Sequence, residues 1–172
     1  MSEHLQNEQD ATTEKYLVFE VGRKPFSLPI SIVREVMEYT EVDPIPTAPA
    51  FVVGAINLRG NVIPVLSLAL RFGEEQSVVS NRTCIVIVEV LRSGESLVIG
   101  LLVDLVTKVL ELDLDRVDDV PSLGGQLENR FIKGLAKTEN QLLSILQVDE
   151  LLTIRDMDLP VEESNGTDSE RK

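Results

Sequence analysis

Histidine and cysteine are almost absent from this sequence, and their scarcity excludes several chemistries. His4 is the single histidine and Cys84 the single cysteine among 172 residues. Because His4 lies in a polar terminal segment, no Ser-His or Cys-His catalytic pair and no histidine metal site can form in a folded core. One cysteine forms no intramolecular disulfide, and its place in the apolar run 83–90 predicts a buried packing residue.

Basic and aromatic residues are also scarce. Sixteen Lys and Arg stand against 29 Asp and Glu, the net charge is −13, and aromatic residues make up 4% of the chain. Small β-barrels that bind single-stranded nucleic acid use basic grooves and stacking aromatics, whereas an acidic surface repels phosphates. We therefore expect protein partners, no nucleic acid and no cofactor.

The chain also lacks a long uncharged run. No stretch could cross a bilayer, and residues 1–10 are polar and acidic, unlike a signal peptide. These features predict a cytoplasmic protein without direct membrane insertion. Residues 1–14 and 158–172 are acidic and poor in apolar residues, so both are predicted to be disordered tails around a folded unit at 15–157.

Short β-branched and aliphatic runs, separated by turn residues about every ten positions, dominate the folded unit. This spacing predicts an all-β protein whose strands close into small barrels, with short helical turns beginning near Ser31 and Asp149. The predicted strands are 16–21, 24–29, 36–42, 55–58, 61–67, 83–91, 96–103, 108–112, 133–136 and 141–148.

An internal repeat divides the folded unit. Residues 27–38 align with 100–111 at an offset of 73 residues, and residues 51–66 align with 131–146 at an offset of 80. The larger offset places the extra residues in the second half, between Asp113 and Arg130. The repeat predicts two similar barrels, at about 15–75 and about 80–150.

The two halves differ at one hairpin tip. Arg59-Gly60 in the first half corresponds to Glu139-Asn140 in the second. The guanidinium of Arg59 suits a partner's carboxylate or backbone carbonyls, but a solvated turn residue is an equally good interpretation of the sequence.

Carboxylates offer no defined catalytic or metal site. Four aspartates lie close together in the long loop of the second half, but their spacing departs from the EF-hand pattern because Val117 and Asp118 stand where a ligand and a glycine belong. A solvated acidic loop explains them, and we predict neither an enzyme nor a metal protein.

The run 54–68, GAINLRGNVIPVLSL, resembles the signature of the CheW family of chemotaxis coupling proteins. Further segments are similar to that family in the same order, and together they cover about 15–153. These segments are 26–30 with 33–36, 44–46, 99–106, 131–135 and 142–152. The resemblance implies two five-stranded, SH3-like barrels packed on each other.

The resemblance also implies a function without catalysis. Such a scaffold couples the cytoplasmic tips of methyl-accepting chemoreceptors to the regulatory domain of the histidine kinase CheA, and is recruited to membrane-bound receptor clusters. The alternative is an adaptor of a non-flagellar array, serving surface motility or another chemosensory kinase. No attached receiver or kinase segment is present in this sequence, and the acidic tails match no motif.

Site residues follow from the same resemblance. Val33, Glu35 and Val36 would line or flank an inter-barrel groove that takes the receptor's helical hairpin. Asn57, Arg59 and Gly60 would form a tip loop for receptor and kinase coupling. Gly54 and Gly100 would allow close approach of the backbone. By periodicity alone the two valines would be ordinary core residues.

Overall fold

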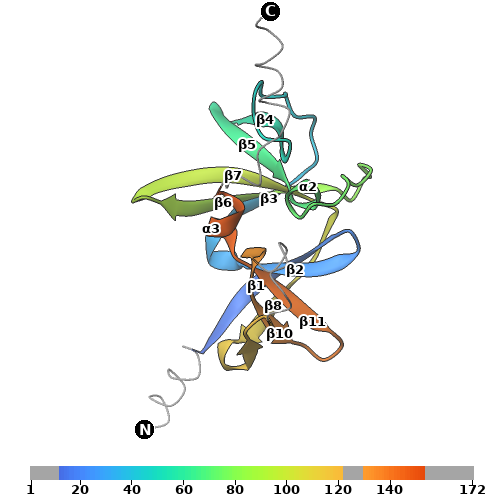
Figure 1. The fold of residues 1–172 in the computed structure, drawn as a ribbon, viewed down its shortest axis with the longest axis vertical. Coiled ribbons are helices and arrows are strands. Elements are labelled where there is room, and N and C mark those ends of the chain that lie inside the picture. The colour runs from blue at the N-terminus through green and yellow to red at the C-terminus, as the bar shows by residue number, and fades with distance from the viewer. Residues whose placement is uncertain (1–11, 122–129, 154–172) are drawn as a thin grey trace, which may run out of the picture.

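The computed structural model describes residues 12–121 and 130–153, which form two β-barrels stacked along the long axis of the molecule (Figure 1). The strands are β1 (Thr13–Val21), β2 (Lys24–Pro29), β3 (Val33–Glu38), β4 (Val52–Leu58), β5 (Asn61–Ser67), β6 (Cys84–Arg92), β7 (Glu95–Val103), β8 (Leu105–Asp113), β9 (Val117–Asp118), β10 (Ile132–Lys137) and β11 (Leu142–Leu146). The short helices are α2 (Leu68–Arg71) and α3 (Val148–Leu151), with 3₁₀ turns η1 (Ile30–Ile32) and η2 (Leu114–Arg116).

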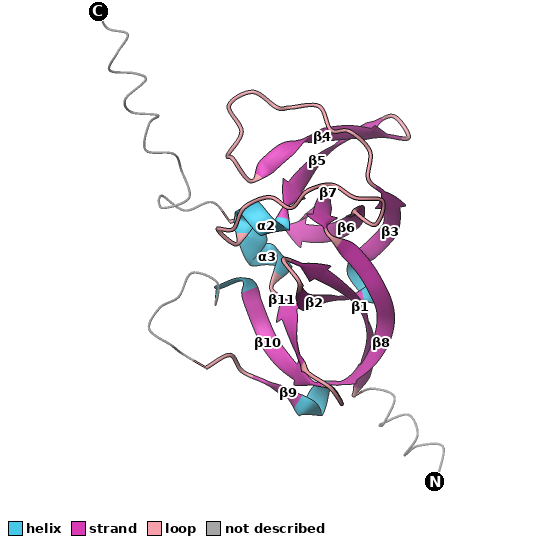
Figure 2. Cartoon of the chain, turned by 90° about the vertical axis from the view of Figure 1, so that its right-hand side faces the viewer, coloured by secondary structure: helices cyan, strands magenta, loops and turns pink. Residues whose placement is uncertain are grey.

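The two sheets exchange strands between the halves of the chain. One sheet has the order β8-β1-β2-β11-β10-β9 and the other the order β3-β6-β7-β5-β4. The two orders are equivalent: if each strand of one sheet is replaced by the strand at the equivalent position in the other half of the chain, the order of the other sheet results. Of the strands described, only the short β9 falls outside this correspondence. The repeat therefore describes an internal two-fold relationship, and Figure 2 shows the strands β1, β2, β8, β10 and β11 curving around one barrel.

The predicted barrel boundaries at 15–75 and 80–150 do not describe this arrangement. The first hairpin, β1–β2, lies in the sheet built mainly from the second half, where β2 runs parallel to β11. The buried hydroxyl of Ser27 donates to the carbonyl of Ser144 at 3.1 Å across this pairing. In the other barrel β5 runs parallel to β7 in the same way. Long-range parallel pairing thus closes each barrel with a hairpin from the opposite half.

The core has a central cluster between the barrels and one cluster inside each barrel. Strand β6 contributes to two of these clusters. Val86 and Val88 belong to the central cluster and face the other barrel, whereas Ile85 and Ile87 lie inside the barrel that contains β6. A strand buried on both faces reads as a continuous apolar run, and this explains the sequence CIVIVEV.

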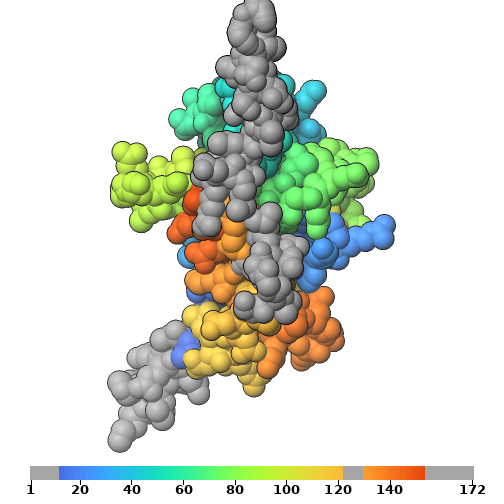
Figure 3. Space-filling view, viewed as in Figure 1, coloured from blue at the N-terminus to red at the C-terminus, as the bar shows by residue number. Residues whose placement is uncertain are grey.

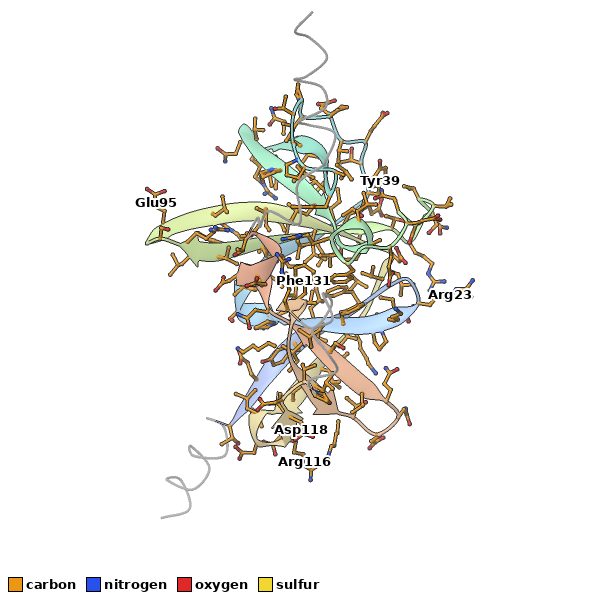
Figure 4. All side chains as sticks on the ribbon, in the orientation of Figure 1. Arg23, Tyr39, Glu95, Arg116, Asp118 and Phe131 are labelled. Carbon is orange, nitrogen blue, oxygen red and sulfur yellow. The ribbon has the colours of Figure 1, made fainter. Side chains whose placement is uncertain are left out.

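Arg71 is the last residue of α2, and its side chain reaches α3 at the centre of the molecule. Its side chain is only 5% exposed and its guanidinium stacks on Phe51 and Phe131, with 4.1 and 4.8 Å to the ring centroids. It also donates to the carbonyls of Leu151 at 2.8 Å and Thr153 at 2.7 Å. Figure 4 shows Phe131 at the junction of the two barrels, so this arginine ties them together.

Several elements differ from the sequence predictions. Strand β3 begins at Val33, because η1 is a single 3₁₀ turn that ends at Ile32. The predicted tails 1–14 and 158–172 lie outside the described residues except at 12–14, and there the prediction was wrong, because β1 begins at Thr13. In the described part of the chain no helix is long and apolar enough to span a membrane.

Candidate functional site

The β4–β5 tip, residues 57–61, brings three of the predicted site residues together. Arg59 and Gly60 have φ values of +52° and +87°, which define the two-residue type I′ turn that fits the twist of antiparallel strands. The Oδ1 atom of Asn57 accepts a hydrogen bond of 3.0 Å from the backbone N–H of Gly60. Asn57 therefore fixes the turn, and Arg59 projects from it.

Arg59 reaches back to strand β3. Its Nη2 atom lies 2.8 Å from Oε1 of Glu35, and its side chain is 70% exposed. An ion pair this exposed contributes at most about 1 kcal/mol to stability. Its effect is positional, because it holds the guanidinium over the opening of the barrel while most of its donors still face solvent.

A groove of about 360 Å³ lies at this opening, between β3 and the β4–β5 hairpin. We call it the barrel-mouth groove. Arg34, Glu35 and Arg59 form its charged rim, and apart from Asn61 the remaining side chains that line it are aliphatic. The aliphatic lining consists of Leu58, Val62, Ile63, Pro64, Ile87, Leu97 and Val98. Val62 is 73% exposed, so the groove presents an apolar surface that a protein partner could cover.

Val33 and Val36 lie on a different face from this groove. Val33 packs partly buried against the central cluster. Val36 pairs with Val86, whose side chain belongs to that cluster, and is itself 40% exposed. The register of β3 shifts between Val33 and Glu35. Glu35 therefore lines the barrel mouth, whereas the two valines face the other barrel.

The internal symmetry adds a residue that sequence reasoning missed. Val109 on β8 occupies the place of Val36 on β3, pairs with the core residue Leu17, and is 51% exposed. We call Val33, Val36 and Val109 the inter-barrel valines. The repeat itself was the available signal, because Val109 lies 73 residues after Val36.

Gly54 and Gly100 are packing positions remote from the tip. A Cβ atom on Gly54 would lie 2.5 Å from the carbonyl oxygen of Asp43, and one on Gly100 would lie 2.8 Å from a methyl of Ile85. Gly134, the counterpart of Gly54, is similarly crowded by Val117. These glycines let neighbouring chain approach closely and shape the barrels, but they do not line the barrel-mouth groove.

At the mouth of the other barrel, the two positions equivalent to Glu35 and Arg59 carry the opposite charges. A groove there is lined by Lys108 and Glu139, the counterparts of Glu35 and Arg59. An arginine held over an aliphatic groove thus occurs at one barrel mouth and is replaced by an acid at the other. Among the described residues, no three His, Cys, Asp or Glu side chains gather where they could hold a metal ion.

The fold and this surface define a double-barrel interaction module, and comparison with known proteins assigns its family. The CheW-like domain model matches residues 15–156. "Chemotaxis protein CheW" of Rhizobium meliloti is 32% identical over 135 residues, covering 78% of this chain and 84% of that protein. "Protein FrzA" of Myxococcus xanthus is 27% identical and covers 81% of this chain and 85% of that protein.

A solved structure agrees with this assignment. The crystal structure of the scaffolding protein TtCheW from Thermoanaerobacter tengcongensis is 33% identical, has a TM-score of 0.74, and covers 83% of this chain and 89% of that one. The chain belongs to the CheW-like domain family. It is a non-catalytic scaffold of chemotaxis signalling, and its two SH3-like barrels are those of the family.

Proposed function

We propose that this protein couples the cytoplasmic tips of chemoreceptors to the histidine kinase CheA, so that receptor signals control autophosphorylation. It would act in the cytoplasm, recruited to membrane-bound receptor clusters. Membership of the CheW-like family supports this proposal. The observation that carries it is Arg59 ion-paired with Glu35 over an aliphatic groove at one barrel mouth, whereas the two equivalent positions at the other mouth have the opposite charges.

The barrel-mouth groove suits the regulatory domain of the kinase. Its aliphatic lining, which includes the largely exposed Val62, would be buried by an apolar strand end of a similar barrel. Glu35 holds Arg59 through one terminal nitrogen, so further guanidinium donors can reach a partner's carboxylate or carbonyls. Burial of such an arginine among apolar contacts is typical of an interface hot spot.

The inter-barrel valines suit the receptor. They lie on the edge strands β3 and β8, each on the face turned towards the opposite barrel. An amphipathic helical hairpin binds through apolar side chains repeated along one face, and the exposed Val36 and Val109, one on each edge strand, offer apolar contacts to it. Receptor and kinase would then use separate surfaces that meet along strand β3, with Glu35 on one face and Val36 on the other.

An adaptor of a surface-motility array or another kinase array would use the same surfaces. The similarity to FrzA is compatible with such a role, but the chemotaxis protein of Rhizobium meliloti is more similar than FrzA, at 32% against 27% identity. We therefore favour chemotaxis.

A ternary pull-down tests the proposal, using a receptor cytoplasmic fragment, CheA and this protein. Arg59→Ala should fail to retain the kinase. Arg23→Ala is a matched control, because Arg23 is also an exposed arginine in a two-residue hairpin turn, with φ of +68°. The control should behave as wild type. Binding of neither partner by wild type would refute the coupling role, and equal retention by both variants would refute the assigned site.

A further inference from the structure

Two clefts flank the junction of the barrels, and the internal symmetry relates them. The first lies beside α2 and is lined by Ser67, Ala69, Leu102 and Asp104 together with residues of the segment 72–83. Its free volume is only about 10 Å³. We call it the filled cleft.

The second cleft lies beside α3 and is open, with a volume of about 550 Å³. Four of its lining residues are the counterparts of the four just named, at the repeat offsets of 80 and 73 residues. These counterparts are Gln147, Asp149, Pro29 and Ser31. The same place in the fold is therefore closed on one side of the molecule and open on the other.

The chain that follows α2 closes the filled cleft. Gln76, Ser77 and Val79 line it, and the hydroxyl of Ser77 donates to the carboxylate of Asp104 at 3.1 Å. Glu74 in the same segment lies 3.0 Å from the ammonium of Lys24 at the β1–β2 tip. In Figure 3 this segment, in green, lies against the blue β1–β2 hairpin, whereas the yellow-green end of the β6–β7 hairpin projects from the molecule.

The chain that follows α3 is the symmetric counterpart of this segment. Ser77 comes six residues after Arg71, and Met157 comes six residues after Leu151, the counterpart of Arg71. Six residues suffice on the first side to reach Asp104, whose counterpart Ser31 lines the open cleft. The connection is therefore long enough for residues near Met157 to reach Ser31.

The chemistry of the open cleft matches this segment. Its lining includes the aliphatic residues Ile32, Leu91 and Val148, and Leu91 is 71% exposed. Its charged lining residues are Arg34, which pairs with Glu89, together with Lys133 and Asp149. The segment 154–161, IRDMDLPV, alternates apolar residues with Asp156 and Asp158. It can cover the aliphatic lining while one of its carboxylates faces Lys133.

We propose that residues 154–161 bind in the open cleft, as the chain after α2 fills its counterpart. The occupant is this chain's own segment. The open cleft shares Arg34 with the rim of the barrel-mouth groove, but the proposal does not rest on the kinase and receptor contacts described above. Binding would cover Leu91 and pack the β6–β7 hairpin against α3.

Paramagnetic relaxation in the full-length protein tests this. Cys84→Ser removes the native thiol, and Ser164→Cys carries a nitroxide a few residues beyond the proposed segment. The amide of Ser31 in the open cleft should lose most of its intensity, while the amide of Asp104 in the filled cleft should keep it. Equal broadening at Ser31 and Asp104, or none at either, would overturn the proposal.

Two further samples separate specific binding from its alternatives. Met157→Asp with Leu159→Asp should restore the Ser31 signal, whereas Asn165→Asp outside the segment should leave it broadened. Mixing spin-labelled protein at natural isotopic abundance with ¹⁵N-labelled protein lacking the nitroxide should give no broadening. If the mixture shows broadening as strong as the sample in which one chain carries both ¹⁵N and the nitroxide, the occupant is a second copy of the protein. That result would contradict the intramolecular site.

Discussion

The Nε atom of Arg71 donates a hydrogen bond of 2.8 Å to the carbonyl oxygen of Leu151, which is the residue in the equivalent place of the second half. A charged side chain from one repeat thus caps the helix of the other. Because hydrogen bonds from charged donors contribute about 1.5–3 kcal/mol and unpaired buried carbonyls are costly, this contact fixes the barrels relative to each other.

Replacing Arg71 should therefore destabilise the whole protein. Arg71→Met keeps an extended apolar side chain but removes the donor to the carbonyls of Leu151 and Thr153, and the Thr153 carbonyl then keeps its hydrogen bond from Arg130. We expect a loss of about 3 kcal/mol in the free energy of unfolding, measured by urea titration. Arg71→Lys should recover little of this lost stability, because an ammonium lacks the planar, forked set of donors and the stacking surface of a guanidinium.

Arg92→Met is the control for that prediction, since Arg92 is exposed at the end of β6. It should change stability by no more than about 0.5 kcal/mol. A similar small change for Arg71→Met would show that the central hydrogen bonds do not hold the barrels together.

Two glycines should respond very differently to alanine. A Cβ on Gly54 would lie 2.5 Å from the Asp43 carbonyl, whereas one on Gly60 would meet no atom within 4 Å. Gly60→Ala should cost about 1 kcal/mol, because its φ of +87° is unfavourable for alanine. Gly54→Ala should cost about 2 kcal/mol more, since backbone must move. Thermal melts of the two variants compare them directly, and equal melting temperatures would argue against the crowding at Gly54.

Alkaline pH should weaken folding through Cys84. Burial raises the pKa of its thiol, the nearby Glu38 carboxylate raises it further, and a backbone hydrogen bond at Val106 acts in the opposite direction. Since the raised pKa belongs to the folded state, the unfolded chain loses its proton first, and stability falls as pH rises above about 8.5 and through the folded value.

Cys84→Ser removes this titration and is the comparison. Unfolding free energies at pH 8 and pH 10 should fall less for the variant than for wild type. The pKa of Tyr16 is also raised by burial, and that contribution is common to both proteins. Parallel pH profiles would show that Cys84 does not contribute.

Val62 and Leu142 allow a matched test of the barrel-mouth groove. They occupy equivalent positions after the two hairpin tips, and both are exposed. Val62→Asp should weaken binding of the CheA regulatory domain by about tenfold or more, because it places a charge in the aliphatic lining. Leu142→Asp should leave the affinity unchanged in the same isothermal titration. If only Leu142→Asp abolishes binding, the kinase contact lies on the other barrel and not at the barrel-mouth groove.

The strands with strong apolar runs could be predicted from the sequence, but their assembly could not. Strand β6 was evident because β-branched residues face two cores. Helix α2 was missed because Leu68 to Leu70 continue the apolar run of β5, although Ser67 offered an N-cap signal: its hydroxyl accepts from the Leu70 N–H at 3.2 Å. The strand exchange depends on parallel pairing between distant segments, which a local repeat does not encode.

The candidate site was predicted only in part for the same reason. The type I′ turn at Arg59-Gly60 follows from local chemistry. The ion pair between Glu35 and Arg59 depends on how β3 faces the β4–β5 hairpin across the barrel mouth, and no local pattern specifies it. The register shift after Val33, which separates Glu35 from the valines, was equally hidden.

The rate of CheA autophosphorylation in the presence of a receptor fragment tests the central claim most directly. Titration with wild type and with Arg23→Ala should change this rate to the same saturating level, whereas Arg59→Ala should leave it near the value without adaptor. A wild-type titration that leaves the rate unchanged would contradict the coupling function. A full response with Arg59→Ala would contradict the role of the barrel-mouth groove.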